Sequence, residues 1–485
     1  MRFLKFDPDR TVRAICAAGI LLWAYLLTVK FVNYGYYDWD LSLYSQAMWR
    51  MIHGSLDVSL FGMNFFGNHA EYISFLVAPF YFLMPHPLTL VYINVIAFFI
   101  AAYVFYFIFK RFLSPWTAVV FCCLYVMYPP NLFMLVYEFH FESLALPFIA
   151  GMFLFLLEKR FIAFMICGVL ACLCKENIPS ILVMFGLASF FRKGVDRRIW
   201  GMIPVITGLA YFILVMFVVI PYIRRDLPHS GNIYLGMFSR LGTEPGEIMI
   251  SLLTKPWLVW QILVSNGNLF FLNELFSSVS FISFLCPWPL FIGMPILLQS
   301  LFSSAPQFHT IFFHYTATLA PFIFVSAAAG AGVLMKFLRQ RSFHFIMVIL
   351  LFSAVGFVCK YQVPLISRFH FQRDVHDDLY DSMVQRVPPG ASVVASFKFL
   401  NHLSNRDGLY AFYNVWLGKN LLTGRTYVLP DTVQYALVDL ADPWLAADYR
   451  LDPENVDKRV QAFMADGWQV RSRSQDTYLM QRSFK

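Results

Sequence analysis

Two aspartates, Asp38 and Asp40, are the first residues of the chain whose type and position could support catalysis. They follow an apolar run and precede a helical repeat of apolar residues, so they lie near the end of a membrane segment. A carboxylate in this place can take a proton from an acceptor hydroxyl as a general base. It can also cap the N-terminus of the following helix, and both interpretations stay open for each aspartate.

A second cluster contains Glu138, His140 and Glu142 within five consecutive residues, at the predicted start of a helix. Carboxylates and imidazoles can bind a divalent metal, and His69 could supply a further ligand. The same groups can orient sugar hydroxyls or a diphosphate. The two glutamates can instead stabilise the positive N-terminal end of the helix. A divalent metal is therefore an optional cofactor, and the sequence makes no cofactor certain.

The dipeptide Lys175-Glu176 joins two apolar runs of about fourteen residues each. So short a connection places both charges at or below the membrane surface. The two side chains can pair with each other, and Lys175 can also meet a phosphate. Arg224 and Arg225 are further cations that can offset the charge of a leaving phosphate. Ionisable groups near a bilayer are costly, so we interpret these residues as candidates for substrate binding.

Helical periodicity predicts the element that follows the aspartates. Leu41, Tyr44, Met48 and Ile52 recur at helical spacing, with Gln46 elsewhere on the helical wheel. This pattern predicts an amphipathic helix that lies along the outer membrane surface.

Composition places the chain among polytopic membrane proteins. Hydrophobic residues make up 59% of the sequence, charged residues 14%, and the mean hydropathy is +0.60. A soluble protein of 485 residues would need more polar surface to cover its core. Cytoplasmic anchors explain the net charge of +8, and no basic stripe or recognition module indicates nucleic-acid binding. None of the eight cysteines follows Cys359, so we expect no disulfide framework in the tail.

Short basic connections alternate along the chain with connections that carry acids and histidines. Lys and Arg are retained in cytoplasmic loops, so the N-terminus should be cytoplasmic and the acidic clusters should share the outer side. We predict an α-helical domain of about 10–13 transmembrane helices within residues 1–360, with a first outer loop at 33–86. The visible spans are 14–32, 88–109, 113–128, 143–157, 161–174, 178–191, 199–220, 311–335 and 342–360, with two more crossings expected in 249–306.

Residues 361–485 differ from the rest of the chain, because charged residues become frequent there. A Pro-Pro-Gly sequence at 388–390 marks a turn, and short β-branched runs predict strands. The alternation of strands and helices predicts a small α/β domain, which the sidedness places outside the cell membrane. His402, Asn405 and Arg406 can contact an acceptor or form a solvated loop. We expect strands at 391–397, 425–429 and 433–440, a helix at 453–466 and a hairpin at 468–481.

Short motifs follow one another in a specific order: Asp40 to Trp49, His69, Pro129 before Glu138-Phe-His140, Lys175-Glu176, His314-Tyr315, Pro389-Gly390-Ala-Ser392 and His402 to Arg406. This order resembles a bacterial family of predicted membrane proteins catalogued as a domain of unknown function, the 2079 family. The resemblance spans roughly residues 33–475. That family is similar to the C-type glycosyltransferases, which use polyprenyl-phosphate sugars and carry an acidic motif in the first outer loop.

The resemblance implies a glycosyltransferase C-like fold and a transferase function. The family's first-loop carboxylate falls on Asp40, with Asp38 beside it, so Asp40 is the implied base. The implied donor is a polyprenyl-phosphate sugar, and the acceptor is a lipid or glycan outside a bacterial inner membrane. The candidate substrate-binding residues are Lys175, Glu176, Glu138, His140, Glu142, Arg224, Arg225, Gln46, His314 and Tyr315.

Two other functions stay open. A transporter or flippase of lipid-linked sugars would also carry ionisable residues, although internal repeats and sites at the membrane midplane are typical of transporters. The sequence shows no internal repeat, and its polar groups favour one side of the membrane. A non-catalytic membrane scaffold is the third interpretation. The sequence favours a glycosyltransferase, surrounded by membrane lipids, whose active site lies on the outer side.

Overall fold

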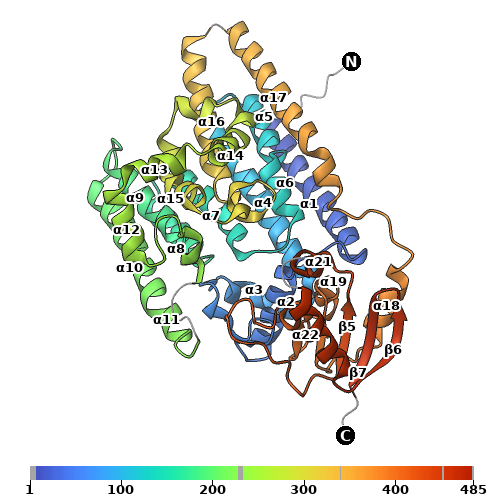
Figure 1. Cartoon of the computed structure of the whole chain (residues 1–485). Coiled ribbons are helices and arrows are strands. Elements are labelled where there is room, and N and C mark those ends of the chain that lie inside the picture. The colour runs from blue at the N-terminus through green and yellow to red at the C-terminus, as the bar shows by residue number, and fades with distance from the viewer. Residues whose placement is uncertain (1–6, 228–232, 339, 450–452, 483–485) are drawn as a thin grey trace, which may run out of the picture.

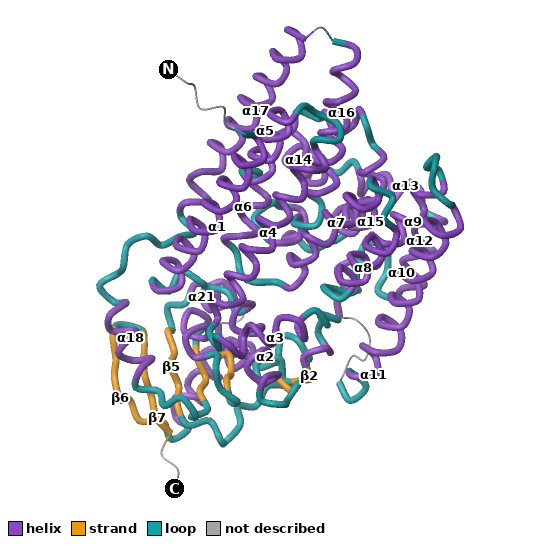
Figure 2. The backbone as a smooth tube through the Cα atoms, turned by 180° about the vertical axis from the view of Figure 1, so that it is seen from behind, coloured by secondary structure: helices purple, strands orange, loops and turns teal. Residues whose placement is uncertain are grey.

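A computed structural model describes residues 7–227, 233–338, 340–449 and 453–482. Helices dominate the chain up to residue 366, and a five-stranded sheet follows in the C-terminal part. Figure 1 shows long helices that run roughly side by side, with the C-terminal sheet gathered at one end of them. Figure 2 shows the same arrangement from behind, with the strands at that end.

Prolines open many of the helices, since a proline fits the first turn, where its missing N–H would have no partner. Polar side chains cap others: the Asp7 carboxylate accepts the N–H of Asp9 at 3.1 Å. The elements before residue 367 are α1 (Pro8–Val32), α2 (Asp40–Ile52), β1 (Asp57–Val58), β2 (Met63–Asn64), α3 (Ser74–Leu83), α4 (Pro87–Phe109), α5 (Pro115–Val126), α6 (Pro129–Val136), α7 (Ala145–Leu157), α8 (Phe161–Cys172), α9 (Pro179–Phe190), α10 (Ile203–Leu214), α11 (Ile220–Ile223), α12 (Pro245–Thr254), α13 (Pro256–Leu263), α14 (Asn266–Phe276), α15 (Trp288–Phe302), α16 (Ala320–Phe337) and α17 (Gln340–Ile366).

Four helices among the described residues are long and apolar enough to cross a membrane: α1, α4, α16 and the continuous helix Arg198–Ile223 that contains α10 and α11. Helices α5 and α6 together form a broken or re-entrant span, bent by 47° just before Pro129. The shorter apolar helices are α3, α8, α9, α15, Phe141–Leu157 and Leu351–Ile366. The expected total number of crossings stays a prediction.

The chain departs from the expected spans in two places. From Pro245 to Phe302 it forms four short helices, α12 to α15, where two crossings were expected in 249–306. The span expected at 311–335 begins later, at Ala320, because Pro321 is favoured in the first turn of a helix. Short 3-10 turns precede it, and one of them contains His314 and Tyr315. These two side chains therefore lie outside the long helix.

Helix α1 connects the two ends of the molecule. Near its start, Lys110 donates to the Asp9 carboxylate at 2.8 Å, so the α4–α5 connection lies beside the N-terminal end. In a second ion pair, Arg111 of the α4–α5 connection lies 2.8 Å from Glu158 of the α7–α8 connection, so the latter connection also lies at this end. Just beyond the other end of α1, the Tyr34 hydroxyl donates to Asp381 of the C-terminal part at 2.8 Å. These basic connections thus share the end opposite to the sheet, and which membrane side each end faces stays a prediction.

Helix α2 is confirmed as a helix, but it is buried where an exposed surface helix was expected. Every side chain in 41–48 is buried. The Ser45 hydroxyl lies 2.7 Å from that of Ser404 in the C-terminal part. The Gln46 amide donates to the carbonyl of Arg406 at 3.1 Å. Helix α2 therefore joins the membrane helices to the C-terminal domain.

The C-terminal sheet confirms the small α/β domain. Its strand order is β4-β3-β5-β7-β6, in which β3 is parallel to β4 and β5, while β7 is antiparallel to β5 and β6. The prediction of a strand at 425–429 is wrong. Within this segment, Thr426 forms only an isolated bridge with Lys419. The flanking residues Gly424 and Pro430 both disfavour strands. The elements are α18 (Asp377–Gln385), β3 (Val393–Ala395), α19 (Phe397–Leu400), β4 (Leu409–Ala411), α20 (Phe412–Leu417), β5 (Tyr435–Asp439), α21 (Pro443–Tyr449), α22 (Pro453–Ala465), β6 (Trp468–Ser474) and β7 (Thr477–Arg482).

The two faces of this sheet bury different surfaces, because successive strand residues point to opposite sides. Val394 and Val438 pack in one cluster with Phe463 of α22. Their neighbours Val393 and Leu437 belong to the same hydrophobic core as the membrane helices. The C-terminal domain is therefore packed onto the membrane part, and a site can form between the two.

Candidate active site

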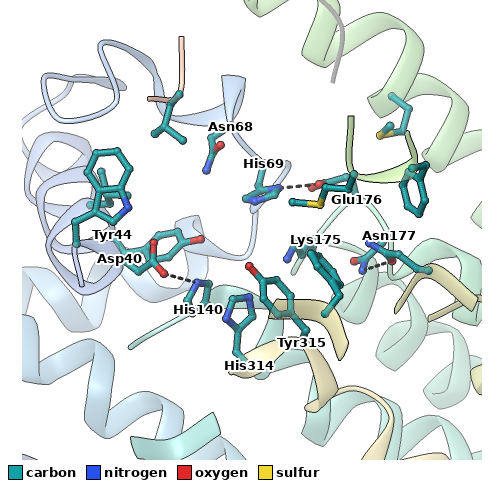
Figure 3. Close-up of a pocket in the computed structure, with 18 of the residues that line it drawn as sticks. Asp40, Tyr44, Asn68, His69, His140, Lys175, Glu176, Asn177, His314 and Tyr315 are labelled. Atoms are coloured by element: carbon teal, nitrogen blue, oxygen red, sulfur yellow. Dashed lines mark hydrogen bonds and ion pairs between the residues drawn. The ribbon is translucent and has the colours of Figure 1, made fainter. Parts of the chain in front are cut away.

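A cavity of about 310 Å³ lies where the membrane helices meet the first loop and the C-terminal domain. This volume is within the range of small-molecule sites, roughly 300–1,000 Å³. Polar and apolar side chains both line it, and the polar residues come from segments far apart in the sequence (Figure 3). The labelled polar residues are Asp40, Tyr44, Asn68, His69, His140, Lys175, Glu176, Asn177, His314 and Tyr315.

Asp40 is the first residue of α2, and its carboxylate points toward His140 at the cavity wall (Figure 3). Its Oδ2 atom lies 3.2 Å from Nε2 of His140. The Tyr137 hydroxyl donates to the same oxygen at 3.4 Å. The Asp40 side chain keeps 22% of its surface exposed. A ligand hydroxyl in the cavity can therefore reach this carboxylate.

His314 supports His140 through ring stacking, with the two centroids 3.4 Å apart. Burial lowers the pKa of His314 well below its usual value, and the neighbouring His140 and Lys175 act in the same direction. The stack holds the His140 ring beside Asp40.

Glu138 caps helix α2 from a distant part of the chain. Its Oε2 atom accepts the N–H of Leu41 at 2.7 Å, and its Oε1 atom accepts the N–H of Asp38 at 3.3 Å. Glu138 lies just before the helical segment Phe141–Leu157, whose first turn contains Glu142, so the cluster marks the start of a helix as predicted. Glu138 itself caps a different helix, α2. Because Glu138 fills the capping role considered for the two aspartates, Asp40 is left for contacts in the cavity.

Asp38 lies behind the same wall and does not line this cavity. Its Oδ2 atom accepts the Tyr137 hydroxyl at 2.7 Å, and its Oδ1 atom accepts the N–H of Trp39 at 2.9 Å. Burial and the charge of Asp40 raise the pKa of Asp38 to about 6. One tyrosine hydroxyl thus lies between the two candidate carboxylates.

Lys175 places a buried ammonium group at the cavity wall. Its Nζ atom donates to Oε2 of Glu142 at 2.6 Å, and the two side chains are 10% and 3% exposed. The Thr318 hydroxyl donates to the other Glu142 oxygen at 3.5 Å. Glu142 lies behind Lys175 and does not line the cavity. An ammonium group carries three donors, so Lys175 can also bind an anion.

Glu176 pairs with His69, whereas the sequence had suggested pairing with its neighbour Lys175. Oε1 of Glu176 lies 2.7 Å from Nδ1 of His69. Its Oε2 atom accepts the N–H of Ala70 at 3.1 Å. Glu176 therefore fixes the loop before α3 against the α8–α9 connection and shapes one end of the cavity.

Three further candidates from the sequence lie outside the cavity lining. Gln46 joins α2 to the C-terminal domain, as described above. Arg224 is almost fully buried and donates to the carbonyl of Gly67 at 3.1 Å. Arg225 is more than half exposed and pairs with Asp226 at 3.7 Å. The structure does not bring these three side chains together with Asp40.

Sequence reasoning missed Tyr137 and misjudged Tyr44. The Tyr137 hydroxyl contacts both aspartates, and its position next to Glu138 was the available signal. Tyr44 was assigned to the apolar face of a helix, but its hydroxyl donates to Glu71 at 3.0 Å. Its ring packs edge-on against His140, with centroids 5.5 Å apart. Both tyrosines help to hold the acidic groups in place.

The four side chains considered as metal ligands, His69, Glu138, His140 and Glu142, each bind a different partner. Within the described ranges, no group of three or more His, Cys, Asp or Glu side chains could hold a metal ion. These residues do not fit a shared metal ion, so no step below is assigned to one.

The family model described as "Predicted membrane protein (DUF2079)" matches residues 33–478. Among solved structures, ArnT from Cupriavidus metallidurans bound to undecaprenyl phosphate is similar, with 12% identity and a TM-score of 0.51 over 95% of this chain and 97% of that chain. The apo state of the same protein gives 10% identity and a TM-score of 0.48 over 96% and 98% of the two chains. No curated protein matches the sequence.

The ArnT likeness shows a shared fold at this low identity. The chain has an ArnT-like fold, a helical membrane part with a small C-terminal sheet domain, which confirms the fold class that its motifs implied. The family match extends from the first loop through the membrane helices and into the last strand, so it covers nearly the whole sequence. The chain therefore belongs to the DUF2079 family of predicted membrane proteins.

Proposed function

We propose that this protein is a membrane glycosyltransferase that moves a sugar from a polyprenyl-phosphate donor to a hydroxyl of a lipid or glycan acceptor. The observation that carries the proposal is the placement of one carboxylate and one buried ammonium, Asp40 and Lys175, on the wall of the same cavity. These are the groups needed to accept a proton and to balance a leaving phosphate. The ArnT-like fold supports the proposal, since ArnT was crystallised with undecaprenyl phosphate.

Apolar residues in the cavity lining suit a lipid carrier. Phe212 and Met216 line it, and both belong to the continuous helix Arg198–Ile223. This helix is long enough to span a membrane and is largely unburied in the protein. A polyprenyl chain can lie along it within the hydrocarbon while the phosphate enters the cavity beside Lys175.

In the proposed step, the acceptor oxygen attacks C1 of the sugar while Asp40 takes the hydroxyl proton. The bond between C1 and the phosphate oxygen breaks, and its electron pair leaves with the phosphate. The products are the glycosylated acceptor and polyprenyl phosphate, with inverted configuration at C1. Lys175 offsets the negative charge on the phosphate. His140 positions the Asp40 carboxylate.

We also propose that the cavity opens on the outer side of a bacterial inner membrane, with the C-terminal domain outside. The support is the gathering of basic connections at the opposite end of the helices, where the Asp9–Lys110 pair lies. Acceptors on the outer leaflet or in the cell envelope would then reach Asp40 from water.

Replacing Asp40 by asparagine tests the assignment of the base. The amide keeps the shape of the side chain but cannot take the proton, so turnover should fall roughly a hundredfold or more. Because Glu138 caps α2, the melting temperature should change little. The assay is release of polyprenyl phosphate from labelled polyprenyl-phosphate sugars by purified protein supplied with cell-envelope acceptors.

Asp57→Asn is a matched control, since Asp57 is an exposed residue of the same outer loop. This variant should keep wild-type turnover. Full activity of Asp40→Asn with a large loss for Asp38→Asn would assign the base to Asp38. Full activity of both variants would remove this loop from the mechanism.

A further inference from the structure

A second cavity, of about 230 Å³, lies on the other side of the wall formed by Asp38 and Tyr137. Its volume is many times the roughly 10–15 Å³ that one water molecule needs. Asp38 lines this cavity and Asp40 lines the first one. The Tyr137 hydroxyl lies between the two carboxylates, at 2.7 Å from Asp38 and 3.4 Å from Asp40. The two cavities therefore meet at the proposed base.

Two cations line the second cavity. Lys30, at the end of α1, is 4% exposed, and its Nζ atom donates to the carbonyl of Val136 at 2.5 Å. The same atom lies 4.1 Å from the centroid of the Tyr36 ring. Arg368, which follows α17, is partly buried. Neither cation forms an ion pair with a carboxylate in the part of the chain that the structure describes.

The carboxylates of this cavity already accept hydrogen bonds from the protein. Asp38 accepts the Tyr137 hydroxyl at 2.7 Å and the N–H of Trp39 at 2.9 Å. Glu138 accepts the N–H of Leu41 at 2.7 Å. Because these carboxylates are hydrogen-bonded to the protein and make no direct ion pair with Lys30 or Arg368, the donors of the two cations can bind a ligand that brings a negative charge.

Aromatic side chains complete the cavity. Tyr37 and Trp444 both line it, and the Trp444 indole N–H donates to the carbonyl of Tyr37 at 2.8 Å. Trp444 belongs to α21, so the C-terminal domain forms part of this site. Aromatic rings offer flat apolar surfaces on which the carbon face of a sugar ring can pack. Rings beside charged groups are therefore suited to a charged saccharide.

We propose that this second cavity binds the acceptor, and that the acceptor is an anionic saccharide whose phosphate or carboxylate is held by Arg368 and Lys30. This inference rests on the proposed glycosyltransferase function and adds the class of acceptor to it. In the complex, the acceptor hydroxyl takes the place of the Tyr137 hydroxyl between Asp38 and Asp40. The donor then occupies the first cavity, and the two substrates meet at Asp40.

The test is thermal unfolding of the purified full-length protein with small probes. Glucose 6-phosphate and glucuronate represent the two possible anions, and glucose is the uncharged control. We expect at least one of the charged sugars to raise the melting temperature more than glucose does. A response to the phosphate alone, or to the carboxylate alone, would support the site and identify the anion.

Two variants connect this response to the second cavity. Arg368→Gln should abolish the gain from the charged sugar, whereas Arg386→Gln, at an exposed arginine, should keep it. Equal responses of Arg368→Gln and wild type, or no advantage of either anion over glucose, would overturn the inference. Undecaprenyl phosphate tests the underlying function separately. It should stabilise wild type and Arg368→Gln but not Lys175→Met, and its failure with wild type would count against the proposed donor.

Discussion

Replacing Lys175 by methionine separates the structural and catalytic roles of the buried ion pair. Lys175 and Glu142 are 10% and 3% exposed, with 2.6 Å between Nζ and Oε2. Methionine keeps most of the side-chain volume but leaves Glu142 buried without a cation. Breaking one partner of such a pair typically costs about 3–5 kcal/mol, so the melting temperature should fall clearly.

The double variant Lys175→Met with Glu142→Gln removes both buried charges. The substituted amide is not ionised and can still accept the hydroxyl of Thr318, so we expect most of the lost stability to return. Turnover of both variants should lie about 10²–10³-fold below that of wild type, because the group that balances the phosphate charge is missing. The double variant should thus regain stability without regaining activity.

Melting temperature and turnover of polyprenyl-phosphate sugar are measured side by side on the same preparations. Lys193→Met, at an exposed lysine of the α9–α10 connection, is the matched control and should change neither quantity. If the double variant regained wild-type turnover together with its stability, Lys175 would serve to neutralise Glu142, and its assignment to the phosphate would be refuted.

Two further predictions concern topology and pH. Single cysteines in place of Lys193 and Gly390, both exposed, should differ in labelling by a membrane-impermeant thiol reagent on whole cells, with 390 reached and 193 protected. Exposed Cys359 is first changed to serine, and equal or reversed labelling would contradict the sidedness. The raised pKa of Asp38, about 6 against 3.8, means that the folded state holds this proton more tightly. Its contribution to stability is therefore full below about pH 4 and is lost as the pH rises through about 6. Asp38→Asn should remove this loss of stability with rising pH. Identical pH profiles of the melting temperature for the variant and wild type would contradict the role assigned to Asp38.

Local sequence patterns predicted the elements whose structure depends on nearby residues. Long apolar runs correctly located α1 and α4, since about 20 apolar residues are needed to span the hydrocarbon. The spacing of Leu41, Tyr44 and Met48 correctly predicted helix α2. The same spacing could not show that the C-terminal domain would bury this helix, because burial depends on what packs against it.

The contacts that build the candidate site join residues far apart in the sequence. His69 and Glu176 are separated by 107 positions, and Glu138 and Leu41 by 97. A single sequence gives the types of these residues but not their pairing. It therefore left Glu138 open as a ligand of metal or substrate or as a group that stabilises the helix following it, whereas the structure places it at the N-terminus of α2. For Tyr137 the sequence offered only its position next to Glu138, which could not show that its hydroxyl lies between Asp38 and Asp40.

The most direct measurement of the central claim is an experimental structure of the protein in lipid nanodiscs with undecaprenyl phosphate bound. We predict phosphate density within hydrogen-bond distance of the Lys175 ammonium, in the cavity that Asp40 lines, with the prenyl chain along Arg198–Ile223. Phosphate density at Arg368 in the second cavity, or a prenyl chain on another face of the helices, would contradict the account.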